Sequence, residues 1–184
     1  MICLLFAAKH TSAYTSVWTG ARLLSHERFL TAAVDEQDKI AREHSNINGG
    51  GRITDDRYGS MMEMRTLHSC IKETLRLHPP VPMLVRTAHK QFTVRTREGH
   101  EYAVPAGHTI ASPIVISNQV PYIYMDGHLY DPDRFGPAGR EEDKGGGKCS
   151  YASFGGGRTG CVGEGYAYMQ IKAIWSHLLR NFEL

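Results

Sequence analysis

Hydrophobic positions recur with helical spacing in three parts of the chain. Residues 4 to about 30 have helical character, and a second helical segment, rich in Ala, Glu, Gln and Lys, continues to about residue 44. Residues 61–77 form an apolar-periodic stretch, which the Pro79-Pro80 pair ends. A last helix is predicted from about residue 161 to residue 180.

After Pro82 the pattern changes to short stretches rich in β-branched and aromatic residues. The strands predicted there are Met83–His89, Phe92–Arg97, Glu101–Val104 and Thr109–Ile116. Glu98-Gly99-His100 has the composition of a hairpin turn between the second and third of them. The predicted fold class is therefore mainly α with small β segments.

Polar and glycine-rich stretches separate these elements. Gly49-Gly50-Gly51 predicts a flexible linker, and Thr54-Asp55-Asp56 predicts the N-cap region of a short helix. Residues 117–148 form a long irregular segment that includes Gly145-Gly146-Gly147. Long irregular segments in compact domains are usually functional or disordered.

The bulk composition is that of one ordinary globular domain. The 184 residues are 41% hydrophobic and 22% charged, with a net charge of +2 and no basic block that would indicate a nucleic-acid partner. Four cysteines without a C-x-x-C pair and ten histidines without an H-x-x-x-H pair argue against a zinc site. No apolar run approaches the roughly 18 residues of a membrane helix.

The stretch Phe154 to Gly163 is a glycine-rich loop that carries one cysteine, Cys161, to the predicted start of the last helix. Gly160 and Gly163 lack a Cβ, so the backbone can turn sharply and a flat ligand can approach the sulfur. A helix N-terminus favours a thiolate, the form in which a protein presents one sulfur to a metal. A buried structural cysteine is the simpler alternative.

The same loop also satisfies a dinucleotide fingerprint, with glycines at Gly155, Gly157 and Gly160. That interpretation requires a strand before the loop, over residues 149–154, and a complete βαβ unit. The sequence offers no second strand after the last helix.

Glu73 and Arg76 are spaced by three residues, so they lie on one helix face and can pair. Such a pair is most often a solvated surface salt bridge of small energetic weight. Farther along the chain, the run Asp131-Pro132-Asp133-Arg134-Phe135 adds a second arginine in an irregular segment.

These motifs, in this order, resemble the cytochrome P450 family of haem-thiolate monooxygenases. The cysteine loop is similar to the family's haem-binding loop, Glu73 and Arg76 to its K-helix pair, and Arg134 to the arginine of its meander. The resemblance implies that Cys161 is the axial ligand of the iron of haem b. It also implies a structural triad of Glu73, Arg76 and Arg134, whose burial makes loss of one member costly.

The first helix resembles the family's I helix, which crosses the distal face of the haem. Its His10-Thr11 pair is typical of the sterol 14α-demethylases, and several neighbouring stretches resemble the plant obtusifoliol demethylases. The resemblance implies that Thr11 and His10 are an oxygen-activating pair, in which His10 supplies protons.

The remaining site residues follow from the same resemblance. It implies haem contacts from Arg86, which binds a propionate, and from the loop residues Phe154, Gly155, Arg158 and Gly163. It also implies a substrate-lining segment, made of Pro82, Met83 and Leu84.

The implied protein is a sterol 14α-demethylase-type monooxygenase that removes a sterol methyl group with O2 and electrons from an NADPH-cytochrome P450 reductase. The chain corresponds to the part of the fold from the I helix to the L helix. Its implied subdivision is 1–44 (I helix and next helix), 54–78 (K helix), 83–116 (small β region), 117–160 (meander and cysteine loop) and 161–180 (L helix). Full-length members are held on the endoplasmic reticulum by an N-terminal helix, and we expect no such anchor here and a truncated form.

Three positions depart from the family pattern. Thr159 stands where a basic residue contacts a haem propionate, Ala8 where a glycine leaves room for dioxygen, and Gly165 where plant members carry proline. The alternative prediction is therefore a non-catalytic fragment that does not hold haem.

Overall fold

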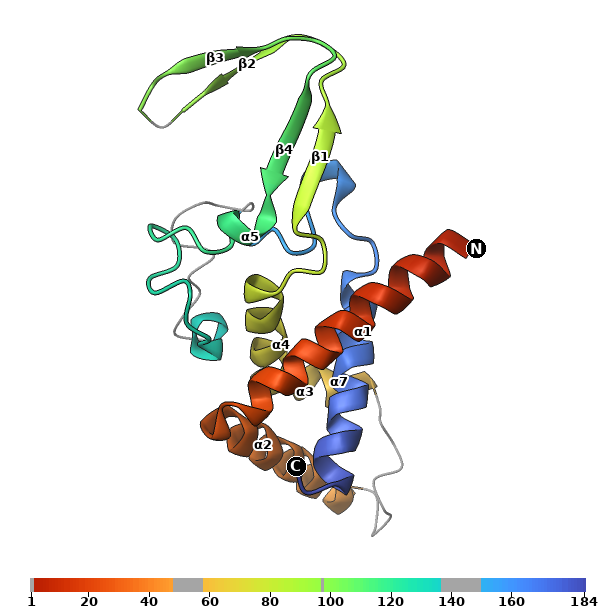
Figure 1. Ribbon diagram of the computed structural model, residues 1–184. Coiled ribbons are helices and arrows are strands. Elements are labelled where there is room, and N and C mark those ends of the chain that lie inside the picture. Colours follow the sequence, from red (N-terminus) through yellow and green to blue (C-terminus); the bar gives the residue numbers. More distant parts are fainter. Residues whose placement is uncertain (1, 48–57, 97, 137–149) are drawn as a thin grey trace.

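The computed structural model describes residues 2–47, 58–96, 98–136 and 150–184. Its secondary structure is mainly helical with two small antiparallel sheets, which confirms the predicted fold class. The helices pack together in one part of the molecule and the sheets project from it (Figure 1). The predicted linker at residues 49–51, the cap at 54–56 and the glycine run at 145–147 lie outside the described residues.

The principal helices surround one hydrophobic core. Their bounds are α1 Ile2–Leu24, α2 Glu27–Ile47, α3 Tyr58–Glu63, α4 Arg65–Leu77 and α7 Glu164–Asn181. Leu23, Leu67 and Ile71 are completely buried between them. Trp175 fixes α7 against α1, because its indole Nε1 donates to the Ser16 carbonyl over 3.0 Å.

The first helix ends earlier than the sequence predicts. The hydrophobic pattern extends to about Leu30, but α1 stops at Leu24 and α2 begins at Glu27. Ser25 Oγ donates to the Ala21 carbonyl over 2.7 Å, and His26 Nδ1 donates to the Arg22 carbonyl over 2.8 Å. These side chains supply donors to carbonyls of the last turn of α1.

The predicted helix over residues 61–77 is interrupted at Met64, which separates α3 from α4. Glu36 of α2 supplies the N-terminal cap of α4, because its carboxylate accepts from the backbone N–H groups of Thr66 (2.7 Å) and Leu67 (3.1 Å). The helix ends at Leu77, directly before His78 and the proline pair, as predicted.

Two antiparallel pairs make up the β region. β1 (Met83–Thr87) pairs with β4 (Thr109–Pro113), and β2 (Phe92–Arg95) pairs with β3 (Glu101–Val104). Gly99 has φ 88° in the turn between β2 and β3, a conformation that favours glycine. β4 ends at Pro113 rather than Ile116, because a short helix, α5 (Ile114–Ser117), follows it.

The described part of the long irregular segment lies against α4. It contains one 3-10 turn, η1 (Pro132–Phe135), which the Asp131 carboxylate caps by accepting from Asp133 N over 3.2 Å. The Tyr130 hydroxyl donates to the Cys70 carbonyl of α4 over 3.3 Å. This segment therefore forms one wall around α4.

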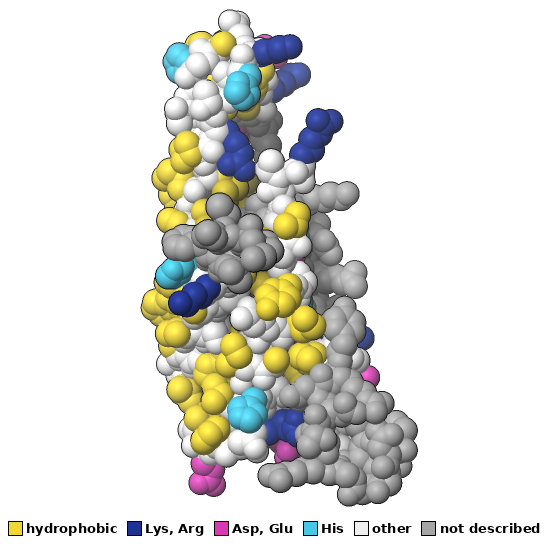
Figure 2. Space-filling view, turned by 90° about the vertical axis from the view of Figure 1, so that its right-hand side faces the viewer, with side chains coloured by type: hydrophobic (Ala, Val, Ile, Leu, Met, Phe, Trp, Pro, Cys, Tyr) yellow, Lys and Arg dark blue, Asp and Glu magenta, His cyan; other side chains and the backbone are white. Residues whose placement is uncertain are grey.

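Hydrophobic side chains also reach the surface, as Figure 2 shows along one edge of the molecule. Val17 of α1 and Val85 of β1 are among the exposed large side chains. Within the described ranges, no helix combines the length and apolar character required to span a membrane.

Candidate functional site

A cavity of about 590 Å³ lies between α1, the residues after α4 and the loop that carries Cys161. α1 contributes Ala7, Thr11 and Thr15 to its wall, and the cysteine loop contributes Phe154 and Cys161. The lining is predominantly apolar, and the volume is within the range of small-molecule and cofactor sites. The cavity can therefore hold a largely apolar ligand.

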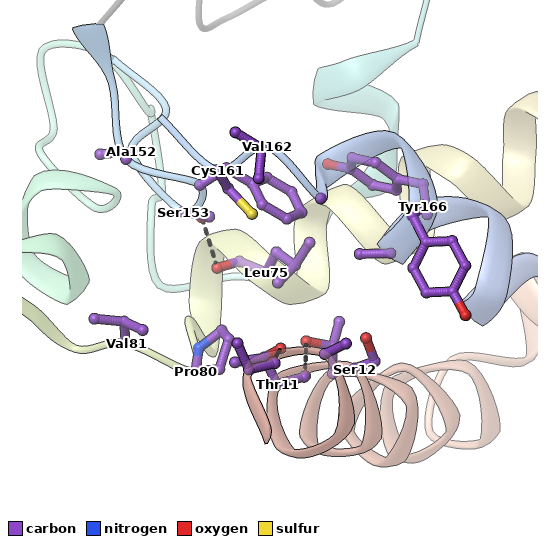
Figure 3. Close-up of a pocket in the computed structure, with 18 of the residues that line it drawn as sticks. Thr11, Ser12, Leu75, Pro80, Val81, Ala152, Ser153, Cys161, Val162 and Tyr166 are labelled. Carbon is purple, nitrogen blue, oxygen red and sulfur yellow. Dashed lines mark hydrogen bonds between the residues drawn. The ribbon is translucent and has the colours of Figure 1, made fainter. Parts of the chain in front are cut away.

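Cys161 is exposed and directs its sulfur into this cavity, toward the side on which Leu75 and α1 lie (Figure 3). The sequence predicts that the cysteine begins the last helix, but α7 starts at Glu164, three residues later. The backbone N–H of Cys161 donates instead to the Phe154 carbonyl over 2.9 Å. This hydrogen bond closes the loop and sets where the sulfur leaves the backbone.

The loop depends on glycine at two positions. Gly155 has φ 73° and Gly157 has φ 64°, both in the left-handed region that residues with a Cβ rarely adopt. Gly157 is also the first residue of a 3-10 turn, η3 (Gly157–Thr159), which precedes Cys161. The sequence assigns the sharp turn to Gly160 and Gly163, but these have φ −59° and −95°, which any residue can adopt, so the left-handed positions are Gly155 and Gly157 instead.

The dinucleotide interpretation lacks its structural context. Residues 150–154, the described part of the required strand, form bends and turns and no strand. The strand, glycine loop and helix that bind a pyrophosphate are thus not assembled around Gly155, Gly157 and Gly160.

Thr11 lies on the cavity wall formed by α1, across from the Cys161 loop (Figure 3). Its hydroxyl donates to the Ala7 carbonyl over 2.6 Å. His10 is exposed and is not among the residues that line the cavity. The two residues separate because consecutive helix positions do not face the same side. Ala8 also lines the cavity, so its methyl group faces the ligand space.

The predicted substrate segment contributes only in part. Leu84 lines the cavity, together with Pro80 and Val81, whereas Pro82 and Met83 do not. Met83 is 48% exposed on the other face of β1, because side chains alternate along a strand. This alternation is the signal by which Leu84 can be separated from Met83 in the sequence.

Arg86 of β1 reaches the cysteine loop. Its Nη2 donates to Thr159 Oγ1 over 3.1 Å, and Thr159 itself lines the cavity. Arg158 is exposed and does not line the cavity. Arg86 is therefore the predicted basic residue that the structure brings to the cavity's edge.

Glu73, Arg76 and Arg134 lie together in a buried cluster. Arg76 forms a bidentate pair with Glu73, with Nε to Oε2 at 2.6 Å and Nη2 to Oε1 at 2.8 Å. Arg134 Nε lies 3.5 Å from Glu73 Oε1. Both members of the first pair are completely buried. The pair is therefore buried, whereas its spacing alone favours a salt bridge at the surface.

The cluster also binds the backbone of the irregular segment. Arg76 donates to the carbonyls of Asn118 (2.9 Å), Gly127 (2.6 Å) and Leu129 (3.0 Å), and Asp131 N donates to Glu73 Oε1 over 2.8 Å. Burial raises the pKa of the Glu73 carboxyl, and the guanidinium of Arg76 opposes that shift. The charges of Glu73 and Arg76 are thus surrounded by hydrogen-bond partners, as a buried ion pair requires.

Asn118 is a component of the site that the sequence did not indicate. It is completely buried, and its side chain contacts both α4 and the root of the cysteine loop. No local pattern marks it, because its side-chain partners lie 34 to 42 residues away in the chain.

Comparison with known families agrees with this geometry. The family profile described as "Cytochrome P450" matches residues 1–184, the whole chain. The chain belongs to the cytochrome P450 family.

Similar members of the family include plant, bacterial and animal proteins. The obtusifoliol 14-alpha demethylase of Sorghum bicolor is 53% identical over 183 residues, and the sterol 14-demethylase of Arabidopsis thaliana is 51% identical over 184 residues. The lanosterol 14-alpha demethylase of Bos taurus is 34% identical over 186 residues. All three alignments cover 100% of this chain but only 33% to 36% of the relative. The chain thus spans about a third of the length of the relatives it matches.

The residues present fit the haem that this cytochrome P450 family implies. The cavity offers apolar walls for a flat macrocycle, one thiol directed inward and one guanidinium, Arg86, beside its edge at Thr159. These are the types of contact that an iron, a porphyrin face and a propionate require.

Proposed function

We propose that this cytochrome P450 chain is the part of a sterol 14α-demethylase-type monooxygenase that runs from the I helix to the L helix. In this assignment α1 is the I helix, α4 the K helix and α7 the L helix. The observation that carries the proposal is the Cys161 thiol, which faces α1 across an apolar cavity. The predicted subdivision of residues 1–184 follows the same assignment.

Cys161 holds the iron of haem b in this proposal, with Phe154, Gly155 and Gly163 against the macrocycle. Bound haem supplies the activation of O2, with electrons from NADPH. Arg86 binds a propionate, and Thr159 holds its guanidinium in place. In this proposal Arg158 contributes to haem binding from outside the cavity, through its positive charge.

Thr11 and His10 have separate polar roles, with Thr11 on the opposite cavity wall and His10 outside the cavity. The Thr11 hydroxyl donates to the Ala7 carbonyl, so in this conformation its lone pairs are available to accept a hydrogen bond. His10 lies on the neighbouring, exposed helix face, and in this proposal it supplies protons from there.

The substrate in this proposal is a sterol that lies against Leu84 and the Pro80-Val81 segment. Pro82 and Met83 lie outside the cavity lining. The substrate class is supported by the plant relatives, whose names specify obtusifoliol and sterol 14-demethylation. An NADPH-cytochrome P450 reductase on the endoplasmic reticulum membrane is the proposed electron donor.

The test of this proposal is haem reconstitution of the purified protein. The reduced, carbon-monoxide-bound protein is expected to show a thiolate-type Soret band that the Cys161→Ala variant loses. Cys70→Ala is the matched control, because Cys70 is buried in the core away from the cavity and the band should persist. A wild-type protein that binds no haem contradicts the proposal.

A substitution at Thr159 tests the alternative that the chain is non-catalytic and does not hold haem. A Thr159→Arg substitution restores a basic side chain at the cavity wall, and a charge-assisted contact contributes about 1.5–3 kcal/mol. If haem binds to this variant only, the natural chain is a non-catalytic form. If haem binds to the wild type and to the variant with equal affinity, Arg86 is sufficient as the basic partner of the propionates.

A further inference from the structure

The C-terminal end of α4 is capped by side chains from distant parts of the chain. The last carbonyls of a helix have no partner within it. Here the Leu75 carbonyl accepts from Ser153 Oγ over 2.9 Å, and the Arg76 carbonyl accepts from Asn118 Nδ2 over 3.2 Å. The end of α4 is thus bonded to the segment that leads into the cysteine loop.

Asn118 is the centre of this arrangement, because its side-chain hydrogen bonds all go to the end of α4 or to the segment before the cysteine loop. Its Nδ2 donates to the Arg76 carbonyl and to Ser153 Oγ (2.9 Å), and its Oδ1 accepts from Ala152 N (3.1 Å). Both amide hydrogens and the oxygen are in use, so a rotated amide would set its NH2 group against the Ala152 N–H. The orientation of the amide is therefore fixed by its partners.

Cys161 is joined to the same anchored residues. Its backbone N–H donates to the carbonyl of Phe154, the residue directly after Ser153, over 2.9 Å. Gly155 N donates to the Ala152 carbonyl over 2.8 Å. Both ends of the loop return to residues 152–154, so the position of the sulfur follows the position of that root.

We infer that Asn118 and Ser153 are positioning residues that set where the Cys161 sulfur enters the cavity. They do so by bonding the root of the loop to the backbone of α4, through hydrogen bonds that do not include the Glu73 carboxylate. The role assigned to the sulfur rests on the proposed function, whereas the anchoring itself does not require haem.

Hydrogen exchange of the intact chain tests the anchoring directly. In Asn118→Ala, exchange in residues 150–161 is expected to rise about tenfold, with α2 and α7 unchanged, because a buried N–H and a carbonyl lose their partner. Ser153→Ala should give a smaller rise, and Ser153→Thr, which keeps the hydroxyl, should restore the wild-type rate. Ser117→Ala is the matched control, since that hydroxyl donates only to the nearby Pro113 carbonyl.

Haem-reconstituted variants provide the second measurement. The Asn118→Ala and Ser153→Ala proteins should show a broadened or displaced thiolate-type Soret band, and Ser153→Thr should not. Unchanged exchange in the loop, or an equal rise across all helices, overturns the inference. If Asn118→Ala does not fold, the Ser153 pair decides by the same criteria. If the wild type binds no haem but the exchange pattern appears, the anchoring stands and the proposed function fails.

Discussion

α4 and the β2–β3 hairpin are held in place by opposite means. α4 is mostly buried, and side chains from α2 and from the cysteine-loop segment bond to its two ends. The strands of the hairpin pair with each other alone among the described residues, and β2 is exposed along its whole length. Isolated two-stranded hairpins are marginally stable. Long-range polar contacts therefore fix the region behind Cys161, while the hairpin depends on its own cross-strand pairs.

The largest expected effect comes from breaking the buried cluster. Glu73→Ala leaves the buried guanidiniums of Arg76 and Arg134 without their carboxylate, which is expected to reduce the free energy of unfolding by about 3–5 kcal/mol. Urea denaturation followed by circular dichroism measures the loss.

An exposed ion pair provides the control for that experiment. Arg28 and Asp133 form a bond of 2.7 Å, similar in length to the buried one, but their side chains are 76% and 61% exposed. Arg28→Ala should therefore cost less than about 1 kcal/mol. Equal losses of unfolding free energy in the Glu73→Ala and Arg28→Ala variants would show that burial does not distinguish the two ion pairs.

The pH dependence of the free energy of unfolding probes the same region through His68 of α4. Burial first, then the charges of Lys172 and Lys72, lowers the pKa of His68 from 6.5 to about 4. Between these values the unfolded chain binds a proton that the folded chain does not, so the free energy of unfolding falls as pH falls from 6.5 to 4. The full loss is about 3 kcal/mol.

Denaturation at a series of pH values measures this slope, and His68→Asn should reduce it. His78 retains part of the slope, because burial and Arg22 also lower its pKa to about 4. A His68 variant with the full wild-type slope would contradict the assignment.

Two helix glycines sharpen the contrast between packed and open surfaces. A Cβ added at Gly20 of α1 would overlap the ring of Trp175, so Gly20→Ala should destabilise the protein by about 1–3 kcal/mol. A Cβ at Gly165 of α7 meets nothing within 4 Å, so Gly165→Ala should stabilise it by up to about 1 kcal/mol. Thermal unfolding of both variants measures the difference, and shifts of the same sign would refute it.

The smallest effect is expected in the hairpin. Tyr102 faces Val94 across the two strands and is 58% exposed, so Tyr102→Ala should change global stability by less than about 0.5 kcal/mol. Hydrogen exchange within residues 92–104 should nevertheless accelerate. A large global loss would mean that the hairpin is coupled to the helices.

The sequence predicts the elements whose signals are local. The helix end before Pro79, the hairpin turn at Gly99 and the four strands appear close to their predicted positions, because proline, glycine and alternation act within a few residues. The pairing of Glu73 with Arg76 also follows from their spacing, although the spacing does not reveal that the pair is buried.

Features that depend on distant partners could not be predicted in this way. The interruption at Met64 depends on Glu36, which caps α4 from another helix, and the role of Asn118 depends on residues 152–153. The separation of His10 from the cavity was predictable in principle, because adjacent helix residues point in different directions. The delayed start of α7 left Cys161 in the loop rather than in the helix.

The capping of α4 by Ser153 also has a consequence for synthesis of the chain on the ribosome. Leu75 and Ser153 are 78 residues apart, so at about 5–20 residues per second the partner of the Leu75 carbonyl is made roughly 4–16 s later. During that interval water must satisfy the end of α4. The helix therefore acquires its final C-terminal hydrogen bonds only when the cysteine loop emerges, which makes this contact one of the last to form in the nascent protein.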